Sequence, residues 1–230
     1  MKPNLKLYCI TCPRKDLSYE EQAERACLGG ADAVQLRDDS LTSKDVLEIG
    51  KRIKDICARH KVLFILNNRA DLALALDADG VHIGQEDLPV RWARQILGSL
   101  KLVGASVSTL GEALRAEKDG ASYLGLGPVF ETPVKQAKKA LGLELITLIK
   151  KRVKIPVVAI GGINLENVGE VLECGADGIA VIRAVCGAQD VTVAARGLKA
   201  RIQASFQAHS APAFKQRATG VGSFRDVVGR

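Results

Sequence analysis

Oxygen-rich side chains cluster in one stretch of the sequence, at residues 67–87. The apolar, β-branched run at 62–66 leads directly into Asn67 and Asn68, and a second apolar run at 80–84 leads into three further polar residues, Gln85, Glu86 and Asp87. A helical pattern separates the two runs, so the stretch predicts a strand–helix–strand unit with parallel strands. Ligands bind at the carboxyl ends of strands in such folds, and the stretch therefore predicts the rim of an active site.

A second pair of candidate residues, Gln35 and Arg37, ends the apolar run at 32–37. Side chains alternate along a strand, so these two face one side and Leu36 faces the other. An inward Gln and Arg at the mouth of a barrel can bind the edge of a heteroaromatic ring and an anion. The alternative is an internal salt bridge between layers of side chains inside the barrel.

Three further features suit the binding of anions. The loop at 127–142 is rich in Gly, Pro and Lys and follows a predicted strand, as expected for a lid. Gly161 and Gly162 follow another strand, and a helix is predicted to begin near Asn164, an arrangement typical of phosphate sites. Arg183 ends the next strand, where it can grip a phosphate through two hydrogen bonds or crowd it.

These segments belong to eight alternations of strand and helix. Strands are predicted at 5–11, 32–37, 62–67, 80–84, 101–106, 123–127, 156–162 and 178–182, and helices at 19–28, 42–60, 72–76, 89–97, 110–118, 141–152, 165–173 and 191–206. A small-residue turn followed by an apolar strand recurs at 30–37, 77–84, 120–127 and 175–182. This even spacing favours a closed barrel over a doubly wound open sheet. We predict a single (β/α)8 TIM barrel at residues 1–208 and a mobile tail at 209–230.

Composition limits the class of protein. With 47% hydrophobic and 4% aromatic residues, the 230-residue chain predicts a large aliphatic core. No apolar run reaches the roughly 20 residues of a membrane span, and the first residues lack a signal-peptide pattern, so we expect a cytoplasmic protein without a membrane partner. Part of the net charge of +7 lies in the tail, and an anionic small molecule explains the rest without nucleic acid. The six cysteines are scattered, which favours thiols in the core over a metal or redox site.

Several of these motifs resemble the thiamine-phosphate synthase family. N-x-R-x-D-L-A at 67–73 and VHIGQEDLP at 81–89 carry the resemblance, which continues with matching spacings from about Leu5 to about Leu198. It implies a transferase of thiamine biosynthesis that joins hydroxymethylpyrimidine diphosphate to thiazole phosphate and releases pyrophosphate. It also implies Mg2+ as cofactor and two small molecules as partners, and it leaves a homo-oligomer open.

The resemblance assigns roles to individual residues of this chain. Gln35, Arg37 and Asn67 match residues that hold the pyrimidine diphosphate, and Ser106 matches a serine on the pyrimidine. In the loop after the sixth strand, Thr132 and Lys135 match contacts to the thiazole phosphate and the diphosphate. Gly162 belongs to the predicted phosphate site, and Asp87 matches a magnesium ligand, with helix capping as its alternative role. The residues implied to be catalytic are Arg37, Ser106 and Lys135.

Four positions depart from the family pattern. Asp39 replaces a lysine, Asn68 a magnesium-binding aspartate, Val134 a threonine and Arg183 a serine. These changes leave two other functions open. One is that of the related thiazole tautomerase, although Ser108 stands where that enzyme has its histidine. The other is a non-catalytic relative that binds phosphorylated ligands or has a regulatory role.

Overall fold

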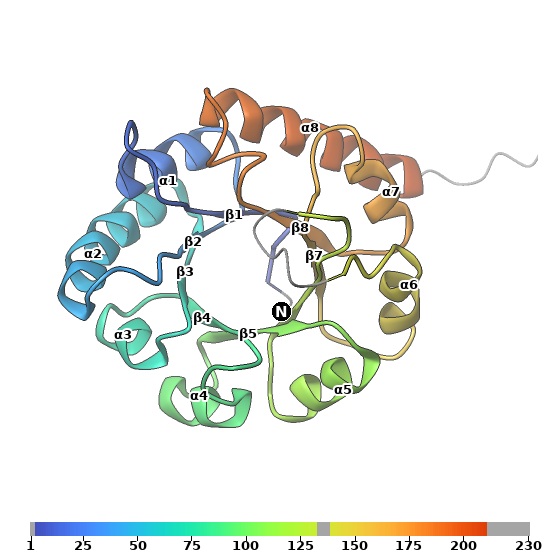
Figure 1. Ribbon diagram of the computed structural model, residues 1–230, viewed down its shortest axis with the longest axis horizontal. Helices are drawn as coiled ribbons and strands as arrows, with labels where there is room; N and C mark the ends of the chain where they lie inside the picture. The colour runs from blue at the N-terminus through green and yellow to red at the C-terminus, as the bar shows by residue number, and fades with distance from the viewer. Residues whose placement is uncertain (1–2, 133–138, 211–230) are drawn as a thin grey trace, which may run out of the picture.

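The protein is a closed barrel of eight parallel strands in the order β1 to β8, surrounded by helices (Figure 1). The computed structural model describes residues 3–132 and 139–210. The strands are β1 Leu7–Ile10, β2 Ala33–Leu36, β3 Leu63–Asn67, β4 Gly80–Ile83, β5 Leu102–Val107, β6 Tyr123–Leu126, β7 Val157–Ile160 and β8 Gly178–Val181. Because β1 pairs with both β2 and β8, the sheet has no edge, and the predicted (β/α)8 barrel is confirmed.

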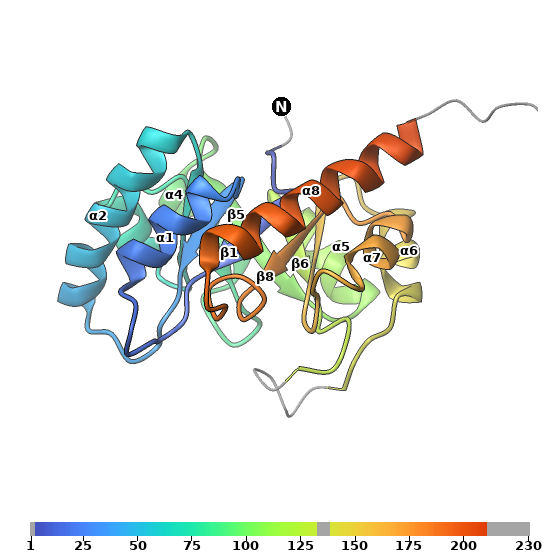
Figure 2. The same cartoon turned by 90° about the horizontal axis from the view of Figure 1, so that it is seen from above.

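The described helices lie outside the strands (Figures 1 and 2). They are α1 Tyr19–Leu28, α2 Ser43–His60, α3 Ala70–Ala75, α4 Val90–Leu97, α5 Leu110–Lys118, α6 Glu144–Lys150, α7 Val168–Glu173 and α8 Val191–Ser210. In this part of the chain no helix is both long enough and apolar enough to cross a membrane.

Alternation along the strands separates two layers of core. One set of buried side chains packs between the strands and the helices, and it includes Cys9, Leu36 and Val81. The other set fills the barrel interior, and it includes Tyr8 and Tyr123. Inward and outward positions therefore follow the period of two expected of strands.

Capping residues explain why some helix starts were predictable. Ser18 begins α1 with a capping box in which its hydroxyl accepts from the backbone of Glu21 and the Glu21 carboxylate accepts from the backbone of Ser18. Thr42 begins α2 with the same motif through Asp45. Each box satisfies backbone N–H groups that the first helical turn leaves without a partner.

Two helices begin three residues later than predicted. The backbone N–H groups of Leu141 and Gly142 donate to the carbonyls of Pro128 and Val129, so this segment pairs with the loop after β6 instead of starting α6. Before α7, the side-chain oxygen of Asn164 accepts from the backbone of Asn167, which forms a turn in place of the predicted helix start.

The last helix is longer than predicted. Helix α8 runs to Ser210, four residues beyond the predicted end and two residues into the predicted tail (Figure 2). Residues 211–230, which make up the rest of that tail, lie outside the described residues.

A glycine inside the barrel provides a test of the packing. Gly104 pairs in register with His82 on one side and Tyr123 on the other. A Cβ atom on Gly104 would lie 2.2 Å from Tyr123 Cζ and 2.6 Å from His82 Nδ1. We expect Gly104→Ala to lower the free energy of unfolding by about 1–3 kcal/mol, the usual cost of overpacking, which is measurable as a lower melting temperature.

Gly111→Ala is the matched control. Gly111 lies in α5, where an added Cβ would meet no atom closer than 3.6 Å. Alanine favours a helix over glycine by up to about 1 kcal/mol, so this variant should be as stable as the native protein or more so. Equal melting temperatures for both alanine variants would contradict the steric argument.

Candidate active site

A cavity of about 350 Å3 opens at the carboxyl ends of the strands. Six of the predicted substrate residues line it, and they lie in or just after four strands (β2, β3, β5 and β7) and in the loop after β6: Gln35, Arg37, Asn67, Ser106, Thr132 and Gly162. The fold therefore brings together side chains that are up to 127 positions apart in the chain (Gln35 to Gly162). Lys135 and Val134 fall within residues 133–138, outside the described part of the chain.

The rim of the cavity at β2 and β3 carries an unexpected contact. The carboxylate of Asp39 lies 3.6 Å from the Arg37 guanidinium and accepts a long hydrogen bond, 3.5 Å, from the side-chain amide of Asn67. Asp39 is 68% exposed, so this ion pair contributes only about 0–1 kcal/mol to stability. Its larger effect is on the cavity, because a carboxylate here offsets the charge of Arg37.

The alternative role considered for Gln35 and Arg37, a salt bridge between layers inside the barrel, is absent from the described residues. Gln35 is 2% exposed and donates from Nε2 to the hydroxyl of Tyr8 at 2.7 Å. Arg37 is half-buried and makes its ion pair with Asp39 at the rim. The two side chains therefore lie at different depths of the same wall.

The residues considered for a metal, Asn68 and Asp87, follow the neighbouring strands β3 and β4, and neither is among the residues that line the cavity. Asn68 has a left-handed backbone, φ 60°, and donates from its N–H to the carbonyl of His82. Asp87 follows β4 and accepts from the backbone N–H of Gly84 at 2.9 Å. Helix α4 begins at Val90 without a side-chain cap, so Asp87 closes the turn after β4 and does not cap the helix. No group of three or more His, Cys, Asp or Glu side chains in the described residues could hold a metal ion.

A chain of hydrogen bonds crosses the barrel interior below this rim. We call it the interior polar chain, and its members are Gln35, Tyr8, Tyr123, His82 and Ser106. The Tyr8 and Tyr123 hydroxyls lie 3.0 Å apart, Tyr123 lies 3.1 Å from His82 Nδ1, and His82 Nε2 lies 2.9 Å from the Ser106 hydroxyl. Burial raises the pKa of both tyrosines, so both keep their protons.

The sequence alone did not single out three members of this chain. Tyr8 and Tyr123 look like ordinary strand residues, and His82 was not placed as a functional group. The two-residue alternation of side chains along strands could have singled out His82. In the barrel His82 pairs in register with Asn67, a residue that the sequence already predicted at the site.

The opposite wall of the cavity, formed by β7 and β8, is shaped by glycine. Gly161 and Gly162 have φ of 103° and 67°, a region that side chains rarely adopt. A Cβ on Gly162 would lie 2.6 Å from Phe130 Cβ, so the loop after β7 packs directly on the loop after β6. Arg183 also lines the cavity, and it makes no ion pair with any described residue. Among the described residues, Arg183 is thus a second cation that lines the cavity, and unlike Arg37 it forms no ion pair with a carboxylate.

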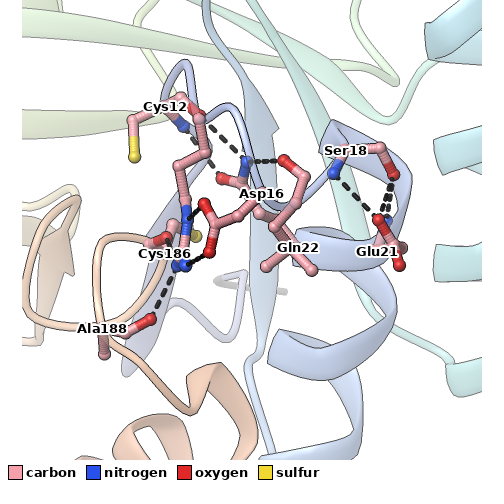
Figure 3. Close-up of polar contacts among 9 residues, drawn as sticks. Cys12, Asp16, Ser18, Glu21, Gln22, Cys186 and Ala188 are labelled. Atoms are coloured by element: carbon pink, nitrogen blue, oxygen red, sulfur yellow. Dashed lines mark hydrogen bonds and ion pairs between the residues drawn. The ribbon is translucent and has the colours of Figure 1, made fainter.

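Two groups of side-chain hydrogen bonds hold the loops beside this wall. The side chain of Gln22 accepts from the backbone N–H of Cys12 and donates to the carbonyl of Cys12, which holds the loop after β1 (Figure 3). Arg14 donates to the carbonyls of Cys186 at 3.0 Å and Ala188 at 2.6 Å, and Asp16 holds the same guanidinium (Figure 3). The loops after β1 and β8 thus form one unit next to Arg183.

These features define a class before any relative is considered. A closed barrel of eight parallel strands, with a polar cavity at its carboxyl face, is the architecture of (β/α)8-barrel enzymes.

Comparison with known proteins gives the family. Residues 7–185 match the family described as thiamine monophosphate synthase. The thiamine-phosphate synthase of Methanocella arvoryzae is 49% identical over 199 residues, which cover 85% of this chain and 94% of that protein. The corresponding protein of Pyrococcus furiosus is 48% identical over 200 residues, covering 86% and 95%. The solved structure of thiamine phosphate pyrophosphorylase from Pyrococcus furiosus has a TM-score of 0.82 at 45% identity and covers 88% and 98% of the two chains.

The chain belongs to the thiamine monophosphate synthase family. The family predicted from the sequence motifs is therefore confirmed.

The contact between the loops after β1 and β8 can be tested by hydrogen exchange. The backbone N–H groups of Val185, Cys186 and Gly187 all donate to the carbonyl of Ile182. Removing the hydrogen bonds of Arg14 with Arg14→Ala should speed exchange at these amides by about tenfold, because a lost hydrogen bond costs roughly 1–1.5 kcal/mol. Arg69→Ala, which removes an exposed pair with Asp71, is the control and should leave them protected. Unchanged exchange in Arg14→Ala would show that the loop holds its shape without the arginine.

Proposed function

We propose that the cavity joins hydroxymethylpyrimidine diphosphate to thiazole phosphate, giving thiamine phosphate and pyrophosphate. One observation carries the proposal: six candidate substrate residues from four strands and the loop after β6 line a single cavity in a chain that is 49% identical to the thiamine-phosphate synthase of Methanocella arvoryzae. The names of these relatives confirm the predicted activity, a transferase of thiamine biosynthesis.

Different walls of the cavity bind different parts of the two substrates. Gln35 and Ser106 lie at the inner end of the cavity, where they bind the pyrimidine ring. Arg37 and Asn67 at the rim hold the diphosphate. Gly162 and Arg183, on the opposite wall, bind the thiazole phosphate, and Thr132 contributes from the loop after β6. The role of Lys135, in the same loop, stays a prediction.

The reaction depends more on stabilisation of the charge that develops in the transition state than on a nucleophile from the protein. When the diphosphate leaves, positive charge develops on the pyrimidine methylene, and the electron-rich aminopyrimidine stabilises it. Negative charge develops at the same time on the leaving group, next to Arg37. Fixed cations and hydrogen-bond donors aimed at that charge lower the barrier because they are already in place. The thiazole is held through its phosphate at the opposite wall. Its ring nitrogen then forms the new bond to the methylene carbon of the pyrimidine.

The donor set at the corner between β3 and β4 suits Mg2+ shared with the substrate. Mg2+ prefers oxygen ligands and usually combines one or two carboxylates with substrate phosphates and water. Asp87 supplies a carboxylate, and Asn68 supplies an amide oxygen without charge. The ion would neutralise developing charge on the pyrophosphate. With one carboxylate fewer than the family pattern, binding should depend on the diphosphate.

A thiazole tautomerase is the less favoured alternative. Ser108, which stands where that enzyme has its histidine, donates from its hydroxyl and its backbone N–H to Glu112 at the start of α5. Its side chain is therefore engaged in local structure. A non-catalytic relative stays the second alternative, because Asp39 and Asn68 both alter the diphosphate end of the cavity.

The remaining expectations are proposals as well. A cytoplasmic location, the absence of nucleic acid as a partner and a possible homo-oligomer all stay predictions. Small molecules as partners follow from the activity itself.

An assay of the purified protein with both substrates, following thiamine phosphate and pyrophosphate, tests the proposed function. In this assay Asp87→Asn should lose most turnover, because asparagine keeps an acceptor for the Gly84 N–H but removes the carboxylate charge. Its melting temperature should stay close to the native value. Asp71→Asn, at an exposed acid paired with Arg69, is the control. Full activity of Asp87→Asn would remove Asp87 from the mechanism.

The two departures near the diphosphate can be reversed together. Asp39→Lys with Asn68→Asp restores a cation beside Asn67 and a second carboxylate at the metal corner. A unit charge at roughly 4–6 Å changes the energy by on the order of 1–4 kcal/mol in a half-buried site. We expect kcat/KM to rise, mainly through a lower KM for the diphosphate. If the native and the reversed proteins both bind the diphosphate yet form no product, the proposed reaction is wrong.

A further inference from the structure

One carboxylate at the cavity has no role in the proposed function. Glu131 lies in the loop after β6, directly before Thr132, and both residues line the cavity. Among the described residues of this lining, Glu131 is the one acidic side chain, and it forms no ion pair with any other described residue. The charge of this carboxylate is therefore directed at whatever the cavity binds.

The order of the strands places Glu131 between the two proposed subsites. Strand β6 pairs with β5 on one side and with β7 on the other. Ser106, assigned above to the pyrimidine, belongs to β5, and Gly162, assigned to the thiazole phosphate, follows β7. A Cβ on Gly162 would lie 2.7 Å from the carbonyl oxygen of Glu131, so the loop that carries Glu131 packs on the loop after β7. Glu131 therefore belongs to the part of the wall where the two rings have to meet.

A carboxylate at this position opposes the binding of anions. Both substrates of the proposed reaction carry phosphate groups, and like charges repel. At the rim, Asp39 already offsets the charge of Arg37, so a second carboxylate lowers the attraction for phosphate further. Anion binding therefore does not account for Glu131.

The proposed reaction also creates a cation, which does account for a carboxylate. The ring nitrogen of thiazole phosphate is neutral and uses its lone pair to form the bond to the pyrimidine methylene. The bond between that methylene and the diphosphate breaks, and its electron pair leaves with pyrophosphate. The ring nitrogen is left with a permanent positive charge, as a thiazolium. A negative group already in place beside the forming bond stabilises this charge more in the transition state than in the bound substrates.

We propose that Glu131 stabilises the positive charge that develops on the pyrimidine methylene and the thiazole ring as they join, and that it makes the cavity prefer a thiazolium to a neutral thiazole. Arg183 then attracts the phosphate of this ligand, and Glu131 attracts its ring. The inference rests on the proposed function, because it concerns a substrate and the product of the same cavity.

Two ligands that differ by one permanent charge test the proposal without turnover. The probes are thiazole phosphate and its N-methyl thiazolium derivative, each titrated by calorimetry into the purified full-length protein. The measured quantity is the ratio of the two dissociation constants. Glu131→Gln, which keeps the size of the side chain, should lower the preference for the thiazolium by about five- to tenfold, the effect of a partly screened carboxylate roughly 6 Å away. An unchanged ratio would overturn the proposal.

Two further variants show whether the local charge is responsible. Glu166→Gln is the matched control, because Glu166 is exposed, lies in the loop after β7 and is not among the residues that line the cavity. It should keep the native ratio, whereas a fall as large as in Glu131→Gln would indicate an effect of net charge and overturn the proposal. Glu131→Asp keeps the charge and should retain most of the preference. A preference lost equally in Glu131→Asp would assign the effect to shape and would also overturn the proposal.

Single-turnover kinetics separate charge stabilisation from a structural role. In Glu131→Gln the rate of thiamine phosphate formation should fall by about fivefold or more. The KM for thiazole phosphate should stay the same or fall, because the ring of this substrate is neutral and the variant repels its phosphate less. Because Glu131 is exposed, the melting temperature should stay close to the native value. A higher KM with an unchanged single-turnover rate would mean a structural role only, and would overturn the proposal.

The results also distinguish this inference from the function on which it rests. A native protein that forms thiamine phosphate, with the same ratio of dissociation constants in Glu131→Gln, overturns the inference alone. A native protein that binds neither thiazole ligand overturns both.

Discussion

The closed barrel has to satisfy every polar group that it places in its interior. The side chains of Tyr8, Gln35, Tyr123 and His82 share that space, and each finds a partner in the next. An unpaired polar group there would cost about 1–3 kcal/mol. Glycine makes the arrangement possible, because Gly104 pairs with both His82 and Tyr123 and has no side chain between them. The rest of the cavity is built on this filled lower layer.

The sequence predicted the fold well because the signals for a barrel are local. Ser18 and Thr42 mark helix starts through residues three positions away, and each buried strand is a short apolar run. The misplaced start of α6 has a different cause. Leu141 and Gly142 bond to the loop after β6, a contact that becomes visible only when strands and loops are packed together.

The same distinction applies to the site. Its rim residues could be named from the sequence because each directly follows a strand, and strands in a parallel barrel end on one face. The contacts between these residues could not be predicted from the sequence. Asp39 lies against Arg37 and Asn67, and Tyr8 meets Tyr123 across 115 positions of the chain. Period-two alternation gives the direction of each side chain, but not the partner that it meets on the other side of the barrel.

The distribution of charge across the cavity links the departures from the family pattern. Arg37 shares its charge with Asp39, whereas Arg183 has no carboxylate partner among the described residues. Relative to the lysine at 39 and the serine at 183 that the family resemblance implies, the wall of β2 carries two units of positive charge fewer and the wall of β8 carries one more. Phosphate affinity follows local charge over distances shorter than the Debye length of about 8 Å. In the proposed function, the wall of β8, which is assigned to the thiazole phosphate, gains attraction for anions, while the diphosphate depends more on the Mg2+ proposed at Asp87. In that proposal the weaker metal site at Asp87 and the more cationic wall of β8 act on different substrates, so the gain at one wall does not repair the loss at the other.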